Sequence, residues 1–340
     1  MLKTRFMHYL AAGAAVLVVT GANAQTFVES EPNDSKAAAN NVLMGTGNFT
    51  AIQGNSTSST GAGLDYFRVQ TTGDALGIYR HRLVLTTQGT AGHTATIRGL
   101  SQTGAAFGPW DGSTVGTPTA TEVAAQTGST ATTPPRFVQW YGFGKREQID
   151  YRVTGTSSTS ADYIASYERM TITPRDIGDY EMGTITINFV GQTTLDTDIW
   201  VYDANLNPIR GYGSDDESIH NGGAGTTLQS RLRRDYGLGR YYIAVGRFNL
   251  ALDQGSPCDD DFRTGSMLEY PNAVLSSSSA TTTTLASFQM IDANGTTDIV
   301  GDAFGPYDVN WYCFDVVPEP TSMVALGAGL LALAARRRRK

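Results

Sequence analysis

A short acidic segment near the N-terminus, ESEPND, carries four side chains with oxygen atoms: Glu29, Glu31, Asn33 and Asp34. Hard cations such as calcium take about six to eight oxygen ligands at about 2.3–2.6 Å. Because side chains alternate in an extended segment, Glu29, Glu31 and Asn33 would point to one side. Asp65, in the strand-like stretch LDYFRV, would add an oxygen from a neighbouring strand. These residues form a candidate cation site.

The same residues also have a purely structural interpretation. Pro32-Asn33-Asp34 can form a turn that leads into a short helix through SKAAANNV, with Asp34 or Ser35 as the N-cap. The two interpretations do not exclude each other, so the residues alone leave both open.

No familiar catalytic motif accompanies this segment. The sequence contains neither GxSxG, the nucleophile motif of α/β-hydrolases, nor HExxH, the zinc motif of metalloproteases. His81, His93 and His220 lie in separate strand or loop stretches. A second acidic cluster lacks the spacing of an EF-hand loop and is interpreted as polar turns; it comprises Asp196, Asp198, Asp203, Asn205, Asp215, Asp216 and Glu217. We expect a protein that is not an enzyme.

The composition favours strands and turns. The 340 residues include 38 glycines, 16 tyrosines and 13 phenylalanines, and 17% are charged, against about 25% in typical domains. Short segments such as DYFRVQTT and RLVLTT alternate in the manner of half-buried strands, with Phe67 and Val69 on one face. The net charge of −7 argues against nucleic acid as a partner, because phosphate binding needs a basic face. We expect an all-β protein.

The chain is long enough for two domains, and the order of its strands supports that division. In the second half, WVYDANLNP and YGLGRYYIAV repeat the order of TIRGLSQTG and RFVQWYGFGKREQIDYRV in the first half. We therefore predict two β-sandwich domains, at 25–172 and 173–317, the second with an insertion at 251–307. Within that insertion, Cys258 can form a disulfide with Cys313, since these are the two cysteines of the chain. Two free thiols are the alternative.

Aromatic side chains offer another kind of binding site. Exposed rings can stack against sugars, and Trp110, Trp140, Trp200 and Trp311 would form such a platform if they lay together on the surface; more often such residues face a core. A carbohydrate- or protein-binding module is therefore the alternative function. A secreted hydrolase is the less favoured one.

The N-terminus has the pattern of a secretory signal peptide. Basic residues precede an apolar stretch, and Ala22-Asn23-Ala24 follows it. We predict a signal helix at 1–24 that is cleaved between Ala24 and Gln25.

The C-terminus reads VVPEPTSMVALGAGLLALAARRRRK. Its apolar run, 323–335, would form about 20 Å of helix, which is short for a hydrocarbon core of about 30 Å. The basic cluster after it would stay cytoplasmic by the positive-inside rule, so the rest of the chain would face outward. That cluster comprises Arg336, Arg337, Arg338, Arg339 and Lys340. A simple tail anchor is the alternative to a processed signal.

Pro318-Glu319-Pro320, the short apolar helix and the terminal arginines together resemble the PEP-CTERM sorting signal (318–340). In that family an exosortase in the inner membrane of Gram-negative, exopolysaccharide-producing bacteria recognises the signal and processes the protein towards the cell exterior. The resemblance implies an exosortase as partner, a transient inner-membrane stage and a final place at the cell surface or in the extracellular matrix. Exopolysaccharide is the further partner that we expect.

ESEPND, Asp65-Tyr66-Phe67 and the segment YIASY (163–167) resemble the bacterial pre-peptidase C-terminal (PPC) domain. That family implies a jelly-roll-like β-sandwich that serves as an accessory module on secreted bacterial proteins. Some members hold calcium near an N-terminal Glu-x-Glu-x-Asn-Asp segment. The resemblance therefore implies that Glu29, Glu31, Asn33, Asp34 and Asp65 bind calcium. The second half has RDIGDYEMG (175–183) in place of the acidic segment, which leaves calcium there without support.

These features predict an exported, non-catalytic protein that an exosortase sorts. It would consist of two jelly-roll-like β-sandwich domains between a signal helix and a short C-terminal hydrophobic helix. Its expected role is structural or adhesive, in the envelope or the exopolysaccharide matrix.

Overall fold

The computed structural model describes residues 25–55, 63–87, 93–98, 126–127, 136–155, 162–247, 250–251, 275–276 and 281–318. These residues form strands and two short 3₁₀ helices, η1 (Lys36–Ala38) and η2 (Ile219–Asn221), and no α-helix is found among them. The expected all-β class is confirmed. The predictions for the signal peptide, the C-terminal helix, Trp110 and Cys258 fall outside the described residues and stay predictions.

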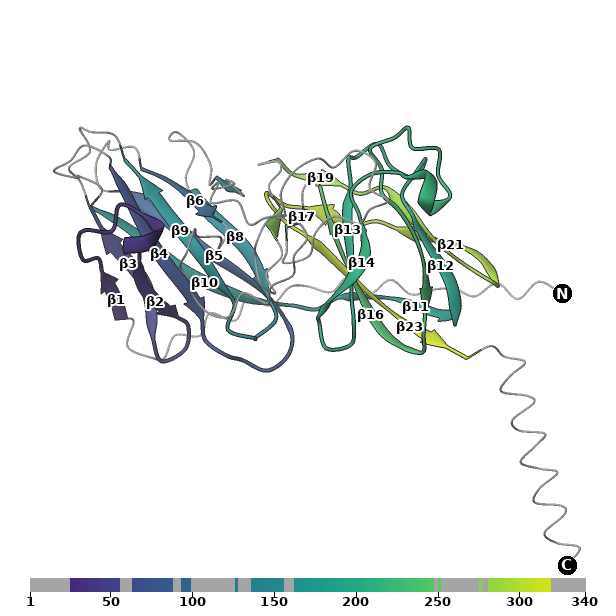
Figure 1. Cartoon of the computed structure of the whole chain (residues 1–340), viewed down its shortest axis with the longest axis horizontal. Helices are drawn as coiled ribbons and strands as arrows, with labels where there is room; N and C mark the ends of the chain where they lie inside the picture. Colours follow the sequence, from purple (N-terminus) through teal and green to yellow (C-terminus); the bar gives the residue numbers. More distant parts are fainter. Residues whose placement is uncertain are drawn as a thin grey trace, which may run out of the picture.

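The first unit, within residues 25–172, is a single folded sheet with the order β7-β6-β9-β4-β2-β3-β10-β5-β8, to which β1 is added beside β3 (Figure 1). A single residue pair, Met44 with Phe49, joins β2 to β3. The sheet therefore bends into two layers, β6-β9-β4-β2 and β3-β10-β5-β8, around one apolar core. The strands are β1 (Gln25–Val28), β2 (Asn40–Met44), β3 (Phe49–Gly54), β4 (Leu64–Thr71), β5 (Ile78–Thr87), β6 (Thr94–Arg98), β7 (Gln126–Thr127), β8 (Arg136–Gly142), β9 (Gln148–Thr154) and β10 (Tyr163–Ile172).

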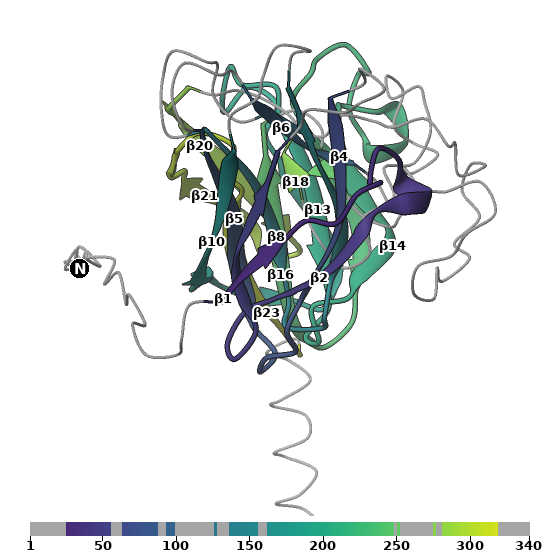
Figure 2. The ribbon, with the colours of Figure 1, turned by 90° about the vertical axis from the view of Figure 1, so that its left-hand side faces the viewer.

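The core of the first unit follows the two-residue period of its strands. Phe67 and Val69 of β4 meet Leu83 and Leu85 of β5 between the layers, and all four are at most 3% exposed. Burial of one such side chain stabilises the fold by about 1.5–3 kcal/mol. Figure 2 views the molecule from the side of this unit, with β1 and β2 towards the viewer.

The second unit, within residues 175–317, has a five-stranded sheet, β11-β23-β16-β13-β14, and a four-stranded sheet, β15-β12-β20-β21, around a second apolar core. Two small ladders, β17-β18 and β19-β22, complete it. The strands are β11 (Arg175–Glu181), β12 (Gly183–Asn188), β13 (Asp198–Tyr202), β14 (Pro208–Ser214), β15 (Arg231–Tyr236), β16 (Gly239–Gly246), β17 (Leu250–Ala251), β18 (Leu275–Ser276), β19 (Thr283–Thr284), β20 (Ser287–Asp292), β21 (Gly295–Val300), β22 (Ala303–Phe304) and β23 (Asn310–Val317).

The insertion predicted at 251–307 includes part of this second core. β20 pairs with β12, and β21 pairs with β20, so these two strands complete the four-stranded sheet. Phe288 and Met290 of β20 are fully buried. The Ser/Thr-rich tract before these residues is the reason why the predicted insertion extends over them. The alternation of Phe288 and Met290 is nevertheless a strand signal. The excursion from the sandwich therefore ends before β20.

The two units share one spatial arrangement of strands. The layer β6-β9-β4-β2 corresponds to β13-β16-β23-β11, and the layer β3-β10-β5-β8 corresponds to β21-β20-β12-β15. In each unit one strand pair is parallel: β4 with β2 in the first and β23 with β11 in the second. The other neighbouring strands within the corresponding layers are antiparallel. The chain order differs, because the counterparts of β3 and β4 come at the end of the second unit. The jelly-roll connectivity and the domain limits stay predictions.

A third apolar cluster joins the units, which lie side by side in Figure 1. Phe143, after β8, lies 5.7 Å from the ring of Trp311 on β23 and 5.2 Å from that of Tyr202 on β13. Arg80 of β5 forms an ion pair with Asp308 at 3.1 Å. The first unit thus covers the outer face of the five-stranded sheet, and the outer face of the four-stranded sheet is turned away from it.

Candidate metal site in the first unit

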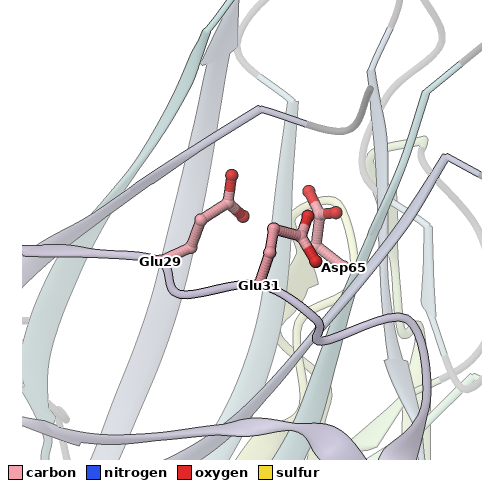
Figure 3. A group of neighbouring side chains, drawn as sticks. All are labelled: Glu29, Glu31 and Asp65. Carbon is pink, nitrogen blue, oxygen red and sulfur yellow. The ribbon is translucent and has the colours of Figure 1, made fainter. Parts of the chain in front are cut away.

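Three carboxylates meet where the segment after β1 crosses the start of β4 (Figure 3). Glu29 and Glu31 come from that segment, Asp65 comes from β4, and one oxygen of each lies within 4.8 Å of the others. The parallel pairing of β1 with β3 holds one end of the segment. The other end is held by Tyr66, whose backbone N–H donates to the carbonyl oxygen of Asn33 at 2.9 Å. The fold therefore brings together residues more than 30 positions apart.

Asn33 is fully buried beside these carboxylates. Its Nδ2 donates to Oε2 of Glu29 at 3.4 Å, and its backbone N–H donates to Oε2 of Glu31 at 2.9 Å. Its Oδ1 is buried and accepts no hydrogen bond from any residue that the structure describes. A buried acceptor without a partner costs roughly 1–3 kcal/mol. Asp34 lies outside the group of three carboxylates, and its Oδ1 is likewise a buried acceptor without a donor among the described residues.

The turn proposed for the same segment is present too. Ser35 is the N-cap of η1, and its Oγ accepts a hydrogen bond from the backbone N–H of Ala38 at 3.3 Å. The acidic side chains and the capped turn occupy successive parts of one segment, so the turn is confirmed and does not exclude the predicted cation site.

Burial dominates the electrostatics of the site. Loss of hydration raises the pKa of Asp65 to about 7, and the charges of Glu29 and Glu31 add to the rise, whereas a hydrogen bond from the hydroxyl of Tyr163 at 2.7 Å opposes it. Burial also raises the pKa of Glu29, although the backbone N–H of Asn55 donates to this carboxylate. Among the described residues, no lysine or arginine forms an ion pair with any of the three.

These features fit a hard divalent cation. Three carboxylates and the free carbonyl oxygen of Asn33 give four oxygen donors, and water completes the coordination of calcium in such sites. A cation would stabilise the ionised forms of Glu29 and Asp65. Gly54 leaves room for the site, because a Cβ there would lie 2.3 Å from both Oε2 of Glu29 and the Tyr163 hydroxyl.

The strand registers identify the same place in the second unit. Asp65 lies opposite Val153 of β9, and Asn310 of β23 lies opposite Val245 of β16. Val153 and Val245 in turn lie opposite Ala95 of β6 and Ile199 of β13, which occupy equivalent positions in the two sheets. Asn310 is therefore the counterpart of Asp65.

By the same registers Arg175 is the counterpart of Asn40, since Asn40 lies opposite Phe67 and Arg175 lies opposite Tyr312. Nη1 of Arg175 lies 3.0 Å from the carboxylate of Asp302, and Nη2 donates to the carbonyl oxygen of Val300. Its guanidinium also lies 4.9 Å from the centroid of the Tyr312 ring. In the second unit an arginine supplies the positive charge at this place.

A second group of carboxylates, not predicted as a site, lies in the second unit. Asp196, Asp215 and Asp216 have oxygens within 4.8 Å of one another, near the ends of β13 and β14. Other members of the predicted cluster serve turns: Asp203 accepts from the backbone N–H of Asn205 at 2.9 Å and of Asn207 at 2.8 Å. The sequence analysis named all three residues in the second acidic cluster, and the antiparallel pairing of β13 with β14 brings Asp196 close to Asp215 and Asp216.

The PEP-CTERM protein-sorting motif matches residues 316–339. The chain ends in a sorting signal. The match includes the predicted Pro318, Glu319 and Pro320 and the predicted arginines Arg336, Arg337, Arg338 and Arg339. It indicates an exported protein that is sorted through the membrane and processed by an exosortase. No curated protein matches the chain, and the described part of the chain holds no helix that is long and apolar enough to cross a membrane.

Two of the three histidines considered for a hydrolase, His81 and His93, lie in the core. His81 stacks between Trp140 and Tyr167, with ring centroids at 5.2 and 5.8 Å, and its Nδ1 lies 2.7 Å from the Tyr167 hydroxyl. Burial lowers the pKa of His81 to about 3. His93 is also buried, 5.0 Å from the ring of Tyr163. His220 lies in η2, and its side chain is outside the described part.

Trp140, Trp200 and Trp311 are at most 4% exposed, which rules them out as a platform for stacking sugars. Trp200 and Trp311 instead fill the junction between the units. Cys313 is a buried free cysteine in the structure. Its predicted partner, Cys258, lies outside the described residues, so the disulfide stays a prediction.

Proposed function

We propose that the protein is a non-catalytic structural or adhesive component of the cell surface or extracellular matrix, delivered there by exosortase processing. The sorting motif at 316–339 supports this most strongly. It begins within the last strand of the body, since Val316 is a core residue of β23. The apolar junction between the units also favours a load-bearing role, because it joins two sandwiches into one body.

We also propose that the units are PPC-like jelly rolls and that the first binds calcium through Glu29, Glu31, Asn33, Asp34 and Asp65. The unpartnered buried Oδ1 of Asn33 beside three carboxylates supports this assignment. Calcium would tie the segment after β1 to β4 and would stabilise the folded state by mass action.

Thermal unfolding with calcium and with a chelator tests the metal proposal. At a calcium concentration about 100 times the Kd, the folded state gains about 2.7 kcal/mol, which corresponds to a rise in Tm of about 5–10 °C for a unit of this size. Asp65→Asn should abolish the rise, whereas Asp179→Asn, at an exposed position of β11, should retain it. Equal Tm values for the parent protein in calcium and in chelator would contradict calcium binding.

Replacement of Pro318 and Pro320 by alanine tests the sorting proposal. Because the exosortase signal needs the Pro-Glu-Pro segment, the variant should accumulate uncleaved in the inner-membrane fraction. Replacement of the adjacent Thr321 and Ser322 by alanine is the matched control and should leave processing intact. Cleavage of the proline variant at the parent rate would refute this assignment of the signal.

A further inference from the structure

The outer face of the sheet β15-β12-β20-β21 carries a shallow hollow of about 530 Å³. Its lining includes two arginines of β15, Arg231 and Arg233, together with Thr186 of β12 and Ile291 of β20. One carboxylate, that of Asp292, also lines it. Its two oxygens already accept hydrogen bonds from the backbone N–H groups of Glu181 at 2.8 Å and Asn294 at 2.9 Å.

A ladder of side-chain hydrogen bonds runs along one end of this hollow and spans all four strands. Arg231 donates to Oδ1 of Asn188 at 3.1 Å, and Asn188 donates to Oε1 of Gln289 at 3.1 Å. Gln289 in turn donates to Asp298 at 2.9 Å. The ladder fixes these side chains before any ligand arrives, which reduces the entropy lost on binding.

The two arginines keep donors available. Arg231 is held by the carbonyl oxygen of Asn221, to which its Nε donates at 3.1 Å, whereas its Nη2 makes no hydrogen bond within the described residues. The backbone N–H of Arg233 donates to Oδ1 of Asn221 at 3.0 Å. Its guanidinium has neither a hydrogen bond nor an ion pair in the described part of the chain. An arginine fork of this kind binds a carboxylate with two parallel hydrogen bonds.

The corresponding face of the first unit already binds a carboxylate. There, Arg80 and Arg82 of β5 lie 3.1 and 3.8 Å from Asp308 of the second unit, and Gln139 of β8 donates to the same carboxylate at 2.9 Å. In the first unit this face is closed by the junction, whereas in the second unit it is turned outward. A carboxylate from outside the chain is therefore the matching occupant.

We propose that this hollow binds the carboxylate groups of an acidic polysaccharide. Arg231 and Arg233 are two residues apart on one strand, about 6.6–6.8 Å. The guanidinium of Arg233 would hold a carboxylate oxygen pair, and Nη2 of Arg231 would donate to a neighbouring carboxylate. Thr184 and Thr186, which line the hollow, offer hydroxyl groups to the sugar hydroxyls. The site is separate from the carboxylates at Glu29, and it gives the proposed matrix role a ligand class.

Acidic peptides fit this face less well. An extended peptide usually adds to a sheet edge, where backbone groups are free. Here the two inner strands, β12 and β20, already pair with neighbouring strands on both sides through their backbone groups. A protein partner also needs an apolar or aromatic anchor with a pocket. Ile291 is the one large apolar side chain that lines the hollow. Guanidinium, amide and hydroxyl groups instead suit a charged sugar chain.

The test is calorimetric titration of the purified full chain with tetragalacturonate in a calcium-free buffer. We expect binding that weakens with added salt and falls by about tenfold or more in Arg233→Gln. The methyl ester of the same oligomer, which lacks the charge, should bind at least about tenfold more weakly. Arg210→Gln, at an exposed arginine of β14, should bind as the parent does.

Three results would overturn the proposal: no binding of tetragalacturonate, equal binding by the parent and Arg233→Gln, or equal binding of a tetraglutamate peptide. The last would assign the hollow to acidic peptides. Because Arg233 makes no side-chain bond within the described residues, Arg233→Gln should melt as the parent does. Calcium is absent from the titration, so failure here leaves the thermal test at Glu29 unaffected.

Discussion

The two units carry different charges at equivalent positions of their matching strands. In the first, the buried Asp65, the half-buried Glu29 and the exposed Glu31 form a negative group beside Asn40. In the second, Asn310 replaces Asp65, and Arg175 replaces Asn40 and pairs with Asp302. The second unit thus supplies its own cation at this place, whereas no described lysine or arginine pairs with the carboxylates of the first. Because the fold forms with either arrangement, the strand arrangement does not require the carboxylates of the first unit, which is consistent with the proposed calcium site.

A second difference lies on the outer faces of the two equivalent layers. On the outer face of β6-β9-β4 the strand registers place Thr96, Arg152 and Arg68, whereas the equivalent positions of β13-β16-β23 hold Trp200, Ala244 and Cys313. Apolar groups on this face of the second unit are covered by the first.

The largest expected effect comes from exchange of a junction residue for its counterpart. Trp200→Thr removes a ring that is 1% exposed, and the loss of burial together with the cavity should lower the free energy of unfolding by about 3–5 kcal/mol. Urea denaturation measures it. Leu238→Ala, at a side chain that is 57% exposed, is the control and should change stability by less than about 0.5 kcal/mol. A loss for Trp200→Thr no greater than that of the control would break the comparison of the two faces.

The next effect comes from transfer of the arginine to the first unit. Asn40→Arg should supply an internal cation near Glu29 and remove the calcium-dependent gain of about 2.7 kcal/mol. Differential scanning calorimetry with calcium and chelator measures this. Asn40→Ala loses the same hydrogen bonds to Ser30 without adding charge, so it should keep its response to calcium. A calcium response in Asn40→Arg as large as in Asn40→Ala would show that the two places are not equivalent.

A third effect is a pH dependence confined to the first unit. Burial raises the pKa of Asp65 from 3.8 in the unfolded chain to about 7. Between these values the folded state holds the proton more tightly, so without calcium the stability should fall as pH rises from about 4 to about 7. Urea unfolding across this range measures it, and the fall should be smaller in Asp65→Asn. In Asn310→Asp the second unit should gain no such dependence, because Arg175 favours the ionised form. Identical pH profiles for the parent and Asp65→Asn would exclude Asp65 as the cause.

Local pattern predicted much of this fold. Alternation placed Phe67 and Val69 in the core, and the order of strands matched WVYDANLNP to TIRGLSQTG, which are now the regions of β13 and β6. The sequence also predicted Glu29, Glu31 and Asp65 as neighbours, because an acidic segment and a strand motif resemble one family.

Other features depend on long-range pairing that no short segment reveals. LDYFRV and NWYCFD occupy equivalent strands, β4 and β23, but the second lies at the end of its unit, so a comparison in chain order cannot align them. The role of Arg175 follows from that alignment and was missed for the same reason. The hollow at Arg231 and Arg233 also depends on the register of β15, β12 and β20, since its side chains come from three separate segments.

The sorting motif begins at residue 316, while β23 continues to Val317 and pairs with β11 along its last residues. The residues between β23 and the apolar run, 318–322, can span at most about 17 Å when fully extended. With the apolar run in the membrane before cleavage, this short linker would keep the folded body close to the membrane surface. Cleavage after Pro320 would release it with its second core complete, whereas a cut before Val316 would take away the end of a strand that holds β11 in place.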